Sequence, residues 1–231
     1  HTIGLNHNFK SSHLHNKTEI HNRERTEKEG LTGSVMDYTP VNLSLDKEQQ
    51  GQYYSTVPGP YDDWAIEFGY SKLKNEDHLE SILSKSTDSR LLFGNDADDM
   101  RSPGKGIDPR AMIGDMSSDP IEYSEERIEL IGGFLTNLIN KYHVDGESFH
   151  RLRDAFLILM REHRNAVTTI SRFVGGIYVD RSFAGQNSLN SPLTPVPYET
   201  QKQAMEALSR YLFSPEAFDV PEKLGNYLQK Q

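Results

Sequence analysis

The amino-acid sequence predicts a mainly α fold, and three observations support this. Apolar residues recur at helical spacing within residues 128–142, 149–177 and 198–213. An Asp-Gly pair and a proline-rich stretch separate these patterns, as expected between helices. No stretch of the chain shows a convincing alternation of apolar and polar residues, which would be typical of half-buried strands.

The composition narrows the class of protein. With 231 residues, of which 35% are hydrophobic and 26% charged, the chain can form one large domain or two small ones. Its net charge of −9 argues against a nucleic-acid-binding face, which would show a basic stripe. No apolar run approaches the roughly 18 residues of a membrane-spanning helix. The absence of cysteine excludes disulfides and cysteine catalysis.

Residues 11–33 are polar, and four basic and four acidic residues between Ser12 and Gly30 cancel in charge. This composition predicts a solvated surface segment that is partly helical. The segment contains His13, His15 and His21. A His-x-His pair can bind zinc, but no third ligand is spaced to join it. We therefore interpret these histidines as surface residues.

A short helix is predicted to begin at Gly59-Pro60 and to end near Gly69. One apolar stripe lies at the helical spacing i, i+3, i+4 and i+7, and Trp64 in this stripe is expected to anchor a core. A second short helix is expected within residues 73–92. The four residues of the stripe are Tyr61, Trp64, Ala65 and Phe68.

Residues 94–109 are rich in Asp, Gly and Pro and are predicted to form a surface loop. The run Asn95-Asp96-Ala97-Asp98-Asp99 raises the question of a calcium site. It lacks the EF-hand order of alternating oxygen ligands, a glycine and a distal glutamate. A surface loop is therefore favoured over a metal site here.

The two longest apolar patterns predict an antiparallel pair of helices. Asp119-Pro120 is typical of an N-cap followed by proline at the first helical position, and the first helix should reach about residue 143. Asp145-Gly146 then interrupts the helical pattern. The connection between the two helices is only a few residues long, so the helices should be antiparallel. Their apolar residues should be more buried than intervening charges such as Arg151 and Glu162. His150 and His163 within the pair are interpreted as packing or surface residues.

The last part of the chain is predicted to contain a loop, a helix and short turns. The loop covers residues 181–197, and the helix covers residues 198–213 with one apolar face. Pro215 and Pro221 should bound the terminal turns. A final apolar patch is formed by Leu224, Tyr227 and Leu228.

The start of the chain carries the clearest chemical pattern, His1-x-x-Gly4-x-x-His7. Histidines six residues apart on a continuous helix lie too far apart along its axis to share one metal ion. Gly4 removes this obstacle, because glycine can adopt a positive φ and end the helix, so that His7 comes back beside His1. The pattern matches the second half of the zinc signature H-E-x-x-H-x-x-G-x-x-H.

The segment Ser34-Val35-Met36-Asp37-Tyr38 follows this pattern and looks like the Met-turn of metzincin peptidases. Together with the segments around His7 and Trp64, it makes the chain resemble a family of bacterial exported zinc-dependent metalloproteases, which are metzincin-like. The resemblance is most specific over residues 1–70. It extends with vaguer motifs through Asp108-Pro109 to the helix at residues 203–208.

The resemblance implies a fold with two parts. Residues 1–72 would be the C-terminal half of a metzincin-like catalytic domain, with its zinc site, Met-turn and buttress helix. Residues 73–231 would form a mainly helical bundle that follows it. Because the chain opens inside the signature, we expect the first histidine and the glutamate to lie upstream, in a longer protein.

The resemblance also implies a peptidase that hydrolyses peptide bonds of a peptide or protein substrate with a zinc-activated water. His1 and His7 would be two zinc ligands, with Gly4 and Met36 structural at the site. Tyr38 would contact either the metal or the oxygen of the tetrahedral intermediate that resembles the transition state. Exported relatives imply an extracellular, periplasmic or cell-surface location. Without the upstream ligand and glutamate, the chain is expected to bind zinc weakly or not at all and to be inactive.

An alternative from another class of protein is a noncatalytic helical module that binds a protein or glycan partner. On this hypothesis the histidine pattern at the start of the chain is accidental. The upstream sequence discriminates between the two, because His-Glu-x-x directly before His1 would establish the peptidase class.

Overall fold

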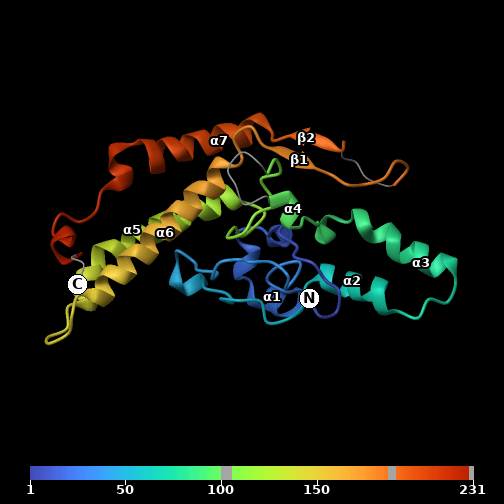
Figure 1. Ribbon diagram of the computed structural model, residues 1–231, viewed down its shortest axis with the longest axis horizontal. Coiled ribbons are helices and arrows are strands. Elements are labelled where there is room, and N and C mark those ends of the chain that lie inside the picture. Colours follow the sequence, from blue (N-terminus) through green and yellow to red (C-terminus); the bar gives the residue numbers. More distant parts are fainter. Residues whose placement is uncertain (100–105, 187–190, 229–231) are drawn as a thin grey trace.

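A computed structural model describes residues 1–99, 106–186 and 191–228 of the protein (Figure 1). Within these ranges there are seven α-helices and two three-residue strands, so the prediction of a mainly α fold is confirmed. Figure 1 shows an elongated molecule, with long helices toward one end and the N-terminal part beside the short helices of the other. None of the helices in the described ranges is both long and apolar enough to cross a membrane.

Two long helices, α5 (Pro120–Tyr142) and α6 (His150–Ser171), pack against each other as the predicted antiparallel pair (Figure 1). Arg151 is exposed and Glu162 half-buried, whereas the apolar stripes provide most of the buried surface. Burial of such side chains is the main force that stabilises a helical pair. The buried residues of the stripes include Ile128, Ile131, Leu135, Leu138, Leu152, Val167 and Ile170.

The second helix of the pair ends at Ser171, six residues before the predicted end. Gly175 has a φ of +73°, which takes the chain out of the helical conformation. Residues Ile177–Val179 then form strand β1, which pairs antiparallel with β2 (Leu193–Pro195), so the predicted loop at residues 181–197 contains a strand. A glycine is needed at Gly176, where a Cβ would lie 2.8 Å from the Arg172 carbonyl oxygen.

Helix α7 (Tyr198–Leu208) continues as a π-helical turn, Ser209–Phe213, and packs on the pair. Its buried Ala204, Ala207 and Leu208 join the core of α5 and α6. Two 3₁₀ turns follow, at Pro215–Phe218 and Leu224–Tyr227, as the prolines predicted. Leu224 is fully buried against the end of the pair at which α5 and α6 are connected.

The N-terminal 59 residues form a compact unit of short turns around helix α1 (Arg23–Glu29). The prediction of a partly helical, solvated segment at residues 11–33 holds for the exposed charged residues of α1 but is wrong for the two ends of the segment. Ser11, Ser12 and Thr26 are buried, although they are polar, since hydrogen bonds replace apolar contacts in this core. Polar composition alone therefore does not show that a segment is exposed to solvent. The short 3₁₀ turns of this part lie at Ser11–Leu14, Glu19–His21 and Lys47–Gln49.

Helices α2 (Pro60–Tyr70) and α3 (Glu76–Leu83) pack together beside this unit. Trp64 is half-buried, and its indole nitrogen donates a hydrogen bond to the Ile82 carbonyl oxygen at 2.8 Å. Phe68 is 47% exposed, so the apolar stripe of α2 is only partly covered. The division of the chain at residues 72 and 73 stays a prediction.

Two further 3₁₀ turns, Ser84–Thr87 and Ser89–Leu91, lead to the four-residue helix α4 (Asp96–Asp99). The sequence predicted a surface loop here. The structure instead contains a short helix with one buried aspartate, Asp99. This helix lies between the N-terminal unit and the end of α6 (Figure 1).

Candidate metal centre

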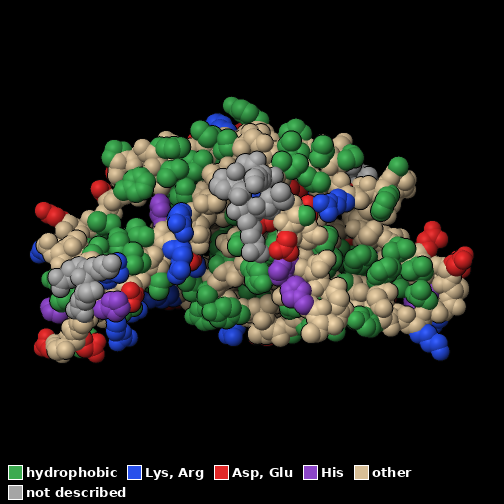
Figure 2. All heavy atoms as spheres, in the orientation of Figure 1, with side chains coloured by type: hydrophobic (Ala, Val, Ile, Leu, Met, Phe, Trp, Pro, Cys, Tyr) green, Lys and Arg blue, Asp and Glu red, His purple; other side chains and the backbone are tan. Residues whose placement is uncertain are grey.

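The first seven residues fold into a turn that brings two histidines together. Gly4 has a φ of +88°, and its amide donates a hydrogen bond to the His1 carbonyl oxygen at 2.9 Å. A side chain at residue 4 would meet no atom, so the glycine is required by its backbone conformation and not by space. The Nε2 atoms of His1 and His7 lie 3.2 Å apart. Figure 2 shows histidine and acidic side chains meeting near the middle of one face.

Both rings present a lone pair to the same space. The Nδ1 atom of His1 lies 2.9 Å from the Leu5 carbonyl oxygen, and that of His7 lies 2.8 Å from Oδ2 of Asp96. Both partners are acceptors, so a neutral ring at either position would carry its proton on Nδ1 and leave Nε2 able to bind. Two converging imidazole nitrogens of this kind are a donor set suited to a metal ion.

The distance between these nitrogens fits the expected metal. Two imidazole nitrogens bound to one tetrahedral zinc ion at the usual bond length would lie about 3.3 Å apart. The observed separation of His1 Nε2 and His7 Nε2 is 3.2 Å. Within the described ranges, no group of three or more His, Cys, Asp or Glu side chains converges on a possible metal position. The residues present therefore fit a partial zinc site with two ligands.

Tyr38 reaches the same space from the segment 34–38. Its hydroxyl lies 3.0 Å from Nε2 of His7, and its side chain is half exposed. Phe9 stacks on the His7 ring with centroids 5.1 Å apart and is fully buried. His7 is thus held between a buried aromatic ring and an exposed phenol.

The segment 34–38 is fixed to the chain that follows His7. The Met36 carbonyl oxygen accepts a hydrogen bond from the Asn8 amide at 3.0 Å, and Met36 is half-buried. On the other side, Asp62 of α2 accepts a hydrogen bond from the Val35 amide at 2.8 Å. The helix after the turn therefore supports it directly, through a carboxylate.

A second carboxylate, that of Asp37, belongs to this turn itself and faces residues 11–12. Oδ2 of Asp37 accepts hydrogen bonds from the Ser11 hydroxyl and the Ser12 amide, at 2.9 and 3.0 Å. Burial, together with the nearby charge of Asp115, raises the pKa of Asp37 well above its ordinary value. Asp115 in turn accepts a hydrogen bond from the Ser12 hydroxyl at 3.0 Å. These contacts tie residues 11–12 to the turn.

The histidines of residues 11–33 are not surface residues as predicted. His13 is largely buried, with Nε2 lying 3.2 Å from Oδ2 of Asp115. His15 is 1% exposed, has Nε2 2.9 Å from the Gly30 carbonyl oxygen, and has its pKa lowered by burial. Neither joins His1 and His7 in a metal-binding group among the described residues.

The histidines of the helical pair behave as the sequence predicted. His150 is exposed, with Nε2 lying 3.3 Å from Oδ2 of Asp154 one turn later. His163 is half-buried in the pair, and burial lowers its pKa.

The run of aspartates at residues 96–99 is engaged with the rest of the protein. Asp96 contacts His7, and Asp98 forms an ion pair with Arg181. Oδ1 of Asp99 accepts a hydrogen bond from Nη1 of Arg172 at 2.9 Å. These are protein contacts, so the structure gives no support to a calcium loop.

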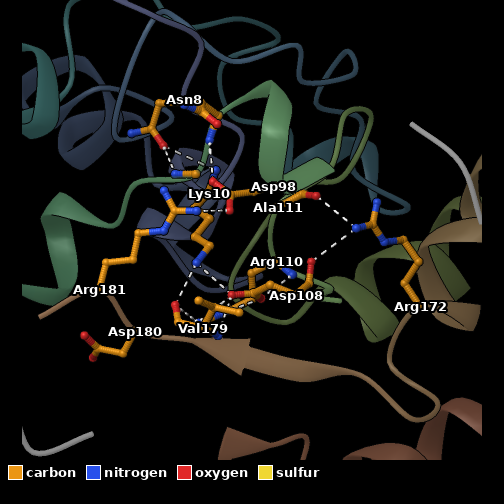
Figure 3. Close-up of polar contacts among 12 residues, drawn as sticks. Asn8, Lys10, Asp98, Asp108, Arg110, Ala111, Arg172, Val179, Asp180 and Arg181 are labelled. Carbon is orange, nitrogen blue, oxygen red and sulfur yellow. Dashed lines mark hydrogen bonds and ion pairs between the residues drawn. The ribbon is translucent and has the colours of Figure 1, made fainter. Parts of the chain in front are cut away.

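A buried ionic network lies behind this run (Figure 3). The Lys10 ammonium lies 2.7 Å from Oδ2 of Asp108 and donates to the Val179 carbonyl oxygen at 3.0 Å. Arg110 forms a bidentate pair with the same carboxylate, at 3.0 and 2.9 Å. The network joins the segment after His7 to strand β1, a connection that no local sequence pattern indicates.

A cavity of about 710 Å³ opens beside Tyr38. Its walls come from Tyr38, from residues 106–114 and from the last turns of α6 with the glycines after it. The lining is mainly apolar, and its charged pair, Asp99 with Arg172, is internally neutralised. Such a cavity is suited to an apolar side chain next to the histidine pair. Its apolar lining residues are Ile107, Met112, Ile113 and Val174.

A comparison with protein-family models gives a match over residues 1–231, to a family described as Met-zincin. No curated protein and no solved structure matches the chain.

Proposed function

The chain belongs to the Met-zincin family, and from this membership we propose that it is part of a zinc-dependent metalloendopeptidase. The observation that carries the proposal is the convergence of the Nε2 atoms of His1 and His7, 3.2 Å apart. The substrate is a peptide or protein. Export to an extracellular, periplasmic or cell-surface location is part of the same proposal.

His1 and His7 would hold the zinc ion together with a histidine that precedes His1. When bound, zinc lowers the pKa of a water ligand and polarises the carbonyl group of the peptide bond. The glutamate of the signature H-E-x-x-H-x-x-G-x-x-H would act as the general base. In the described part of the chain, Leu5 and Asp96 keep the two rings in the tautomer that leaves Nε2 free to bind.

Tyr38 would donate its hydroxyl proton in a hydrogen bond to the oxygen of the peptide carbonyl as charge develops there. Its hydroxyl is 3.0 Å from His7 Nε2, at the edge of the space that both histidines face. Preorganised donors of this kind are effective because they need no reorganisation during the reaction. Met36 and Gly4 are structural, since one ties the turn to Asn8 and the other shapes the histidine turn.

The cavity beside Tyr38 would receive an apolar side chain of the substrate. Tyr38 contributes both to its wall and to the contact with His7, so an occupant lies next to the reacting bond. We therefore expect preference for peptides with an apolar residue adjacent to the cleaved bond.

A chain trimmed to residues 1–231 should bind zinc weakly and should not cleave peptides. Two imidazoles supply only part of the ligand set of a catalytic zinc site, which has three protein ligands. Loss of the general base removes a further factor of roughly 10²–10⁴ in rate. His1 would also be held by a terminus rather than by a preceding helix.

The alternative function, a noncatalytic helical module that binds a protein or glycan partner, is favoured by one observation. A mainly apolar cavity of about 1010 Å³ lies between α5, α6 and residues 210–220. The peptidase is preferred, because the alternative leaves the histidine pair and its two Nδ1 acceptors without a role.

The test is made in the protein that includes the residues preceding His1. Substituting His7→Ala should abolish both stoichiometric zinc binding and metal-dependent cleavage of casein. The control is His150→Ala, an exposed histidine on α6, which should change neither. Unchanged, chelator-sensitive cleavage by the His7→Ala variant would contradict the proposal.

A further inference from the structure

We propose that helix α4 connects the helical pair to the metal centre, with Asp96 and Arg172 as positioning residues for His7. The inference rests on the proposed zinc-binding role of His7. On this proposal the C-terminal helices help to position a ligand of the metal centre and are not a separate module.

The first step is the contact between Asp96 and His7. Oδ2 of Asp96 lies 2.8 Å from Nδ1 of His7, on the far side of the ring from the shared space. A carboxylate at this position fixes the tautomer and the direction of the ring, and it raises the basicity of the opposite nitrogen. The side chain of Asp96 is 55% exposed, so packing around it does not hold it in place.

The second step is the way in which α4 itself is held. A helix of four residues has too few internal hydrogen bonds to be stable alone. Its position is set by the ion pairs of Asp98 with Arg181 and of Asp99 with Arg172. The Asp99 side chain is 3% exposed, so its pair with Arg172 is shielded from water.

The third step is the rigidity of Arg172. It follows directly on α6 and lies between Ile170 and Phe173, which are both buried in the core of the helical pair. Its Nη2 atom also donates to the carbonyl oxygens of Asp108 and Ala111, at 3.2 and 3.1 Å (Figure 3). The guanidinium group therefore has one fixed orientation.

Close packing at the contact supports this arrangement. A Cβ at Gly106 would lie 2.5 Å from Nη2 of Arg172 and 2.6 Å from the Asp99 carbonyl oxygen. Only glycine permits the chain to pass so close to the pair. A continuous connection thus runs from the core of α6 through Arg172 to Asp99, along α4 to Asp96, and from Asp96 to His7.

The experiment measures zinc affinity by competition with a chromophoric chelator, in the protein that includes the residues preceding His1. Asp96→Ala should weaken zinc binding by about 10- to 100-fold, the usual effect of losing such a partner. Arg172→Gln should weaken it by about 2- to 30-fold, as expected of a residue that acts through others. Arg161→Gln, an exposed arginine on α6, and Ala97→Ser, an exposed position on α4, are the matched controls and should leave affinity unchanged.

The double variant separates positioning from mere stabilisation. If Arg172 acts through Asp96, then Arg172→Gln should change zinc affinity less than twofold in the Asp96→Ala background. A merely structural Arg172 would lower the melting temperature equally in both backgrounds and would leave affinity unchanged in both. That result would overturn the role of Arg172.

Two further measurements keep the test decisive. If Arg172→Gln fails to fold, Arg181→Gln replaces it, because the Arg181 side chain is 55% exposed and also acts on α4. In the metal-free protein, nitrogen NMR of His7 should show the Nδ1-protonated tautomer, and Asp96→Ala should reduce its population. Unchanged affinity and tautomer in Asp96→Ala would refute the inference, whereas full zinc affinity in His7→Ala would refute the proposed function instead.

Discussion

Asp62 of α2 holds Ser34, because its Oδ1 atom lies 2.5 Å from the Ser34 hydroxyl oxygen. Oδ2 of the same carboxylate accepts hydrogen bonds from the amides of Val35 and Gly59, at 2.8 and 3.1 Å. Asp62 is only 4% exposed. One buried carboxylate thus fixes the start of the turn that carries Met36 and Tyr38.

Replacing Asp62→Ala should therefore destabilise the protein. Three donors would lose their acceptor in a buried place, and the free energy of unfolding should fall by about 3 kcal/mol or more. Urea denaturation followed by circular dichroism measures this. Asp63→Ala is the matched control, because Asp63 is the exposed neighbour on the same helix, and its effect should stay within about 0.5 kcal/mol. Equal losses in the two variants would contradict the assignment.

Asp108 should make the protein sensitive to acid. Burial alone would raise its pKa, but hydrogen bonds from Arg110 and the charge of Lys10 outweigh this and lower the pKa below its ordinary 3.8. For a carboxyl group with a lowered pKa, the contribution to stability is full above the unfolded value and is lost as pH falls below it. The free energy of unfolding should therefore drop as pH falls below about 4.

The Asp108→Asn variant tests this directly. It leaves the buried Lys10 and the half-buried Arg110 without their charged partner, so it should cost about 3–5 kcal/mol at neutral pH. The part of the acid dependence that comes from residue 108 should disappear. Stability measured by urea titration between pH 3 and pH 7 gives both quantities. A variant whose acid dependence is as steep as that of the parent protein would show that other carboxyl groups are responsible.

Tyr38→Phe should slow catalysis without loss of zinc. Removing one preorganised donor to a developing oxyanion reduces kcat by about 10²-fold in well-studied cases, and KM should change little. Steady-state kinetics on a peptide substrate, with zinc content measured in parallel, provides the check. Tyr54→Phe, which alters a tyrosine that is 63% exposed and outside the cavity lining, serves as the control. Loss of zinc in Tyr38→Phe would instead assign the hydroxyl a role in holding the metal.

Filling the cavity beside Tyr38 should change substrate preference. Asn165 is exposed on α6 and lines the cavity, so Asn165→Trp places a large ring in the space. For peptides with a bulky apolar residue beside the cleaved bond, kcat/KM should fall about tenfold or more. Peptides with glycine there should be affected much less. Arg161→Trp, one turn earlier and outside the lining, controls for tryptophan itself, and an equal fall for both kinds of peptide would contradict this use of the cavity.

The sequence predicts the helical pair well but misplaces its end. Apolar residues at helical spacing identify α5 and α6, because both helices bury one stripe and expose the other faces. The same spacing continues to Ile177, although Gly175 has already turned the chain. The burial of polar residues in the N-terminal unit could not be predicted, for a different reason. Hydrogen bonds from Ser12 and similar residues stabilise its interior, and such bonds leave no periodic pattern in the sequence.

The candidate metal centre is predictable only where it is local. His1, Gly4 and His7 stand within seven residues, and their spacing implies the turn. Asp96 could not be found, since it lies 89 residues from His7 within an acidic run typical of a surface loop. The role of Asp62 could not be predicted either. An aspartate in the first turn of a helix is common because it interacts favourably with the helix dipole, so its presence does not indicate a contact with another segment.

The bond between Lys10 and the Val179 carbonyl oxygen joins residues 169 positions apart. By contrast, only residues 143–149 connect helices α5 and α6. Contacts between residues close in sequence form faster than contacts between distant residues, so this pair can form early. The ribosome makes His1 and His7 well before β1, so the strand that anchors the segment after them emerges later. The centre therefore takes shape late in synthesis, and a half-made chain carries its histidines without the framework that orders them.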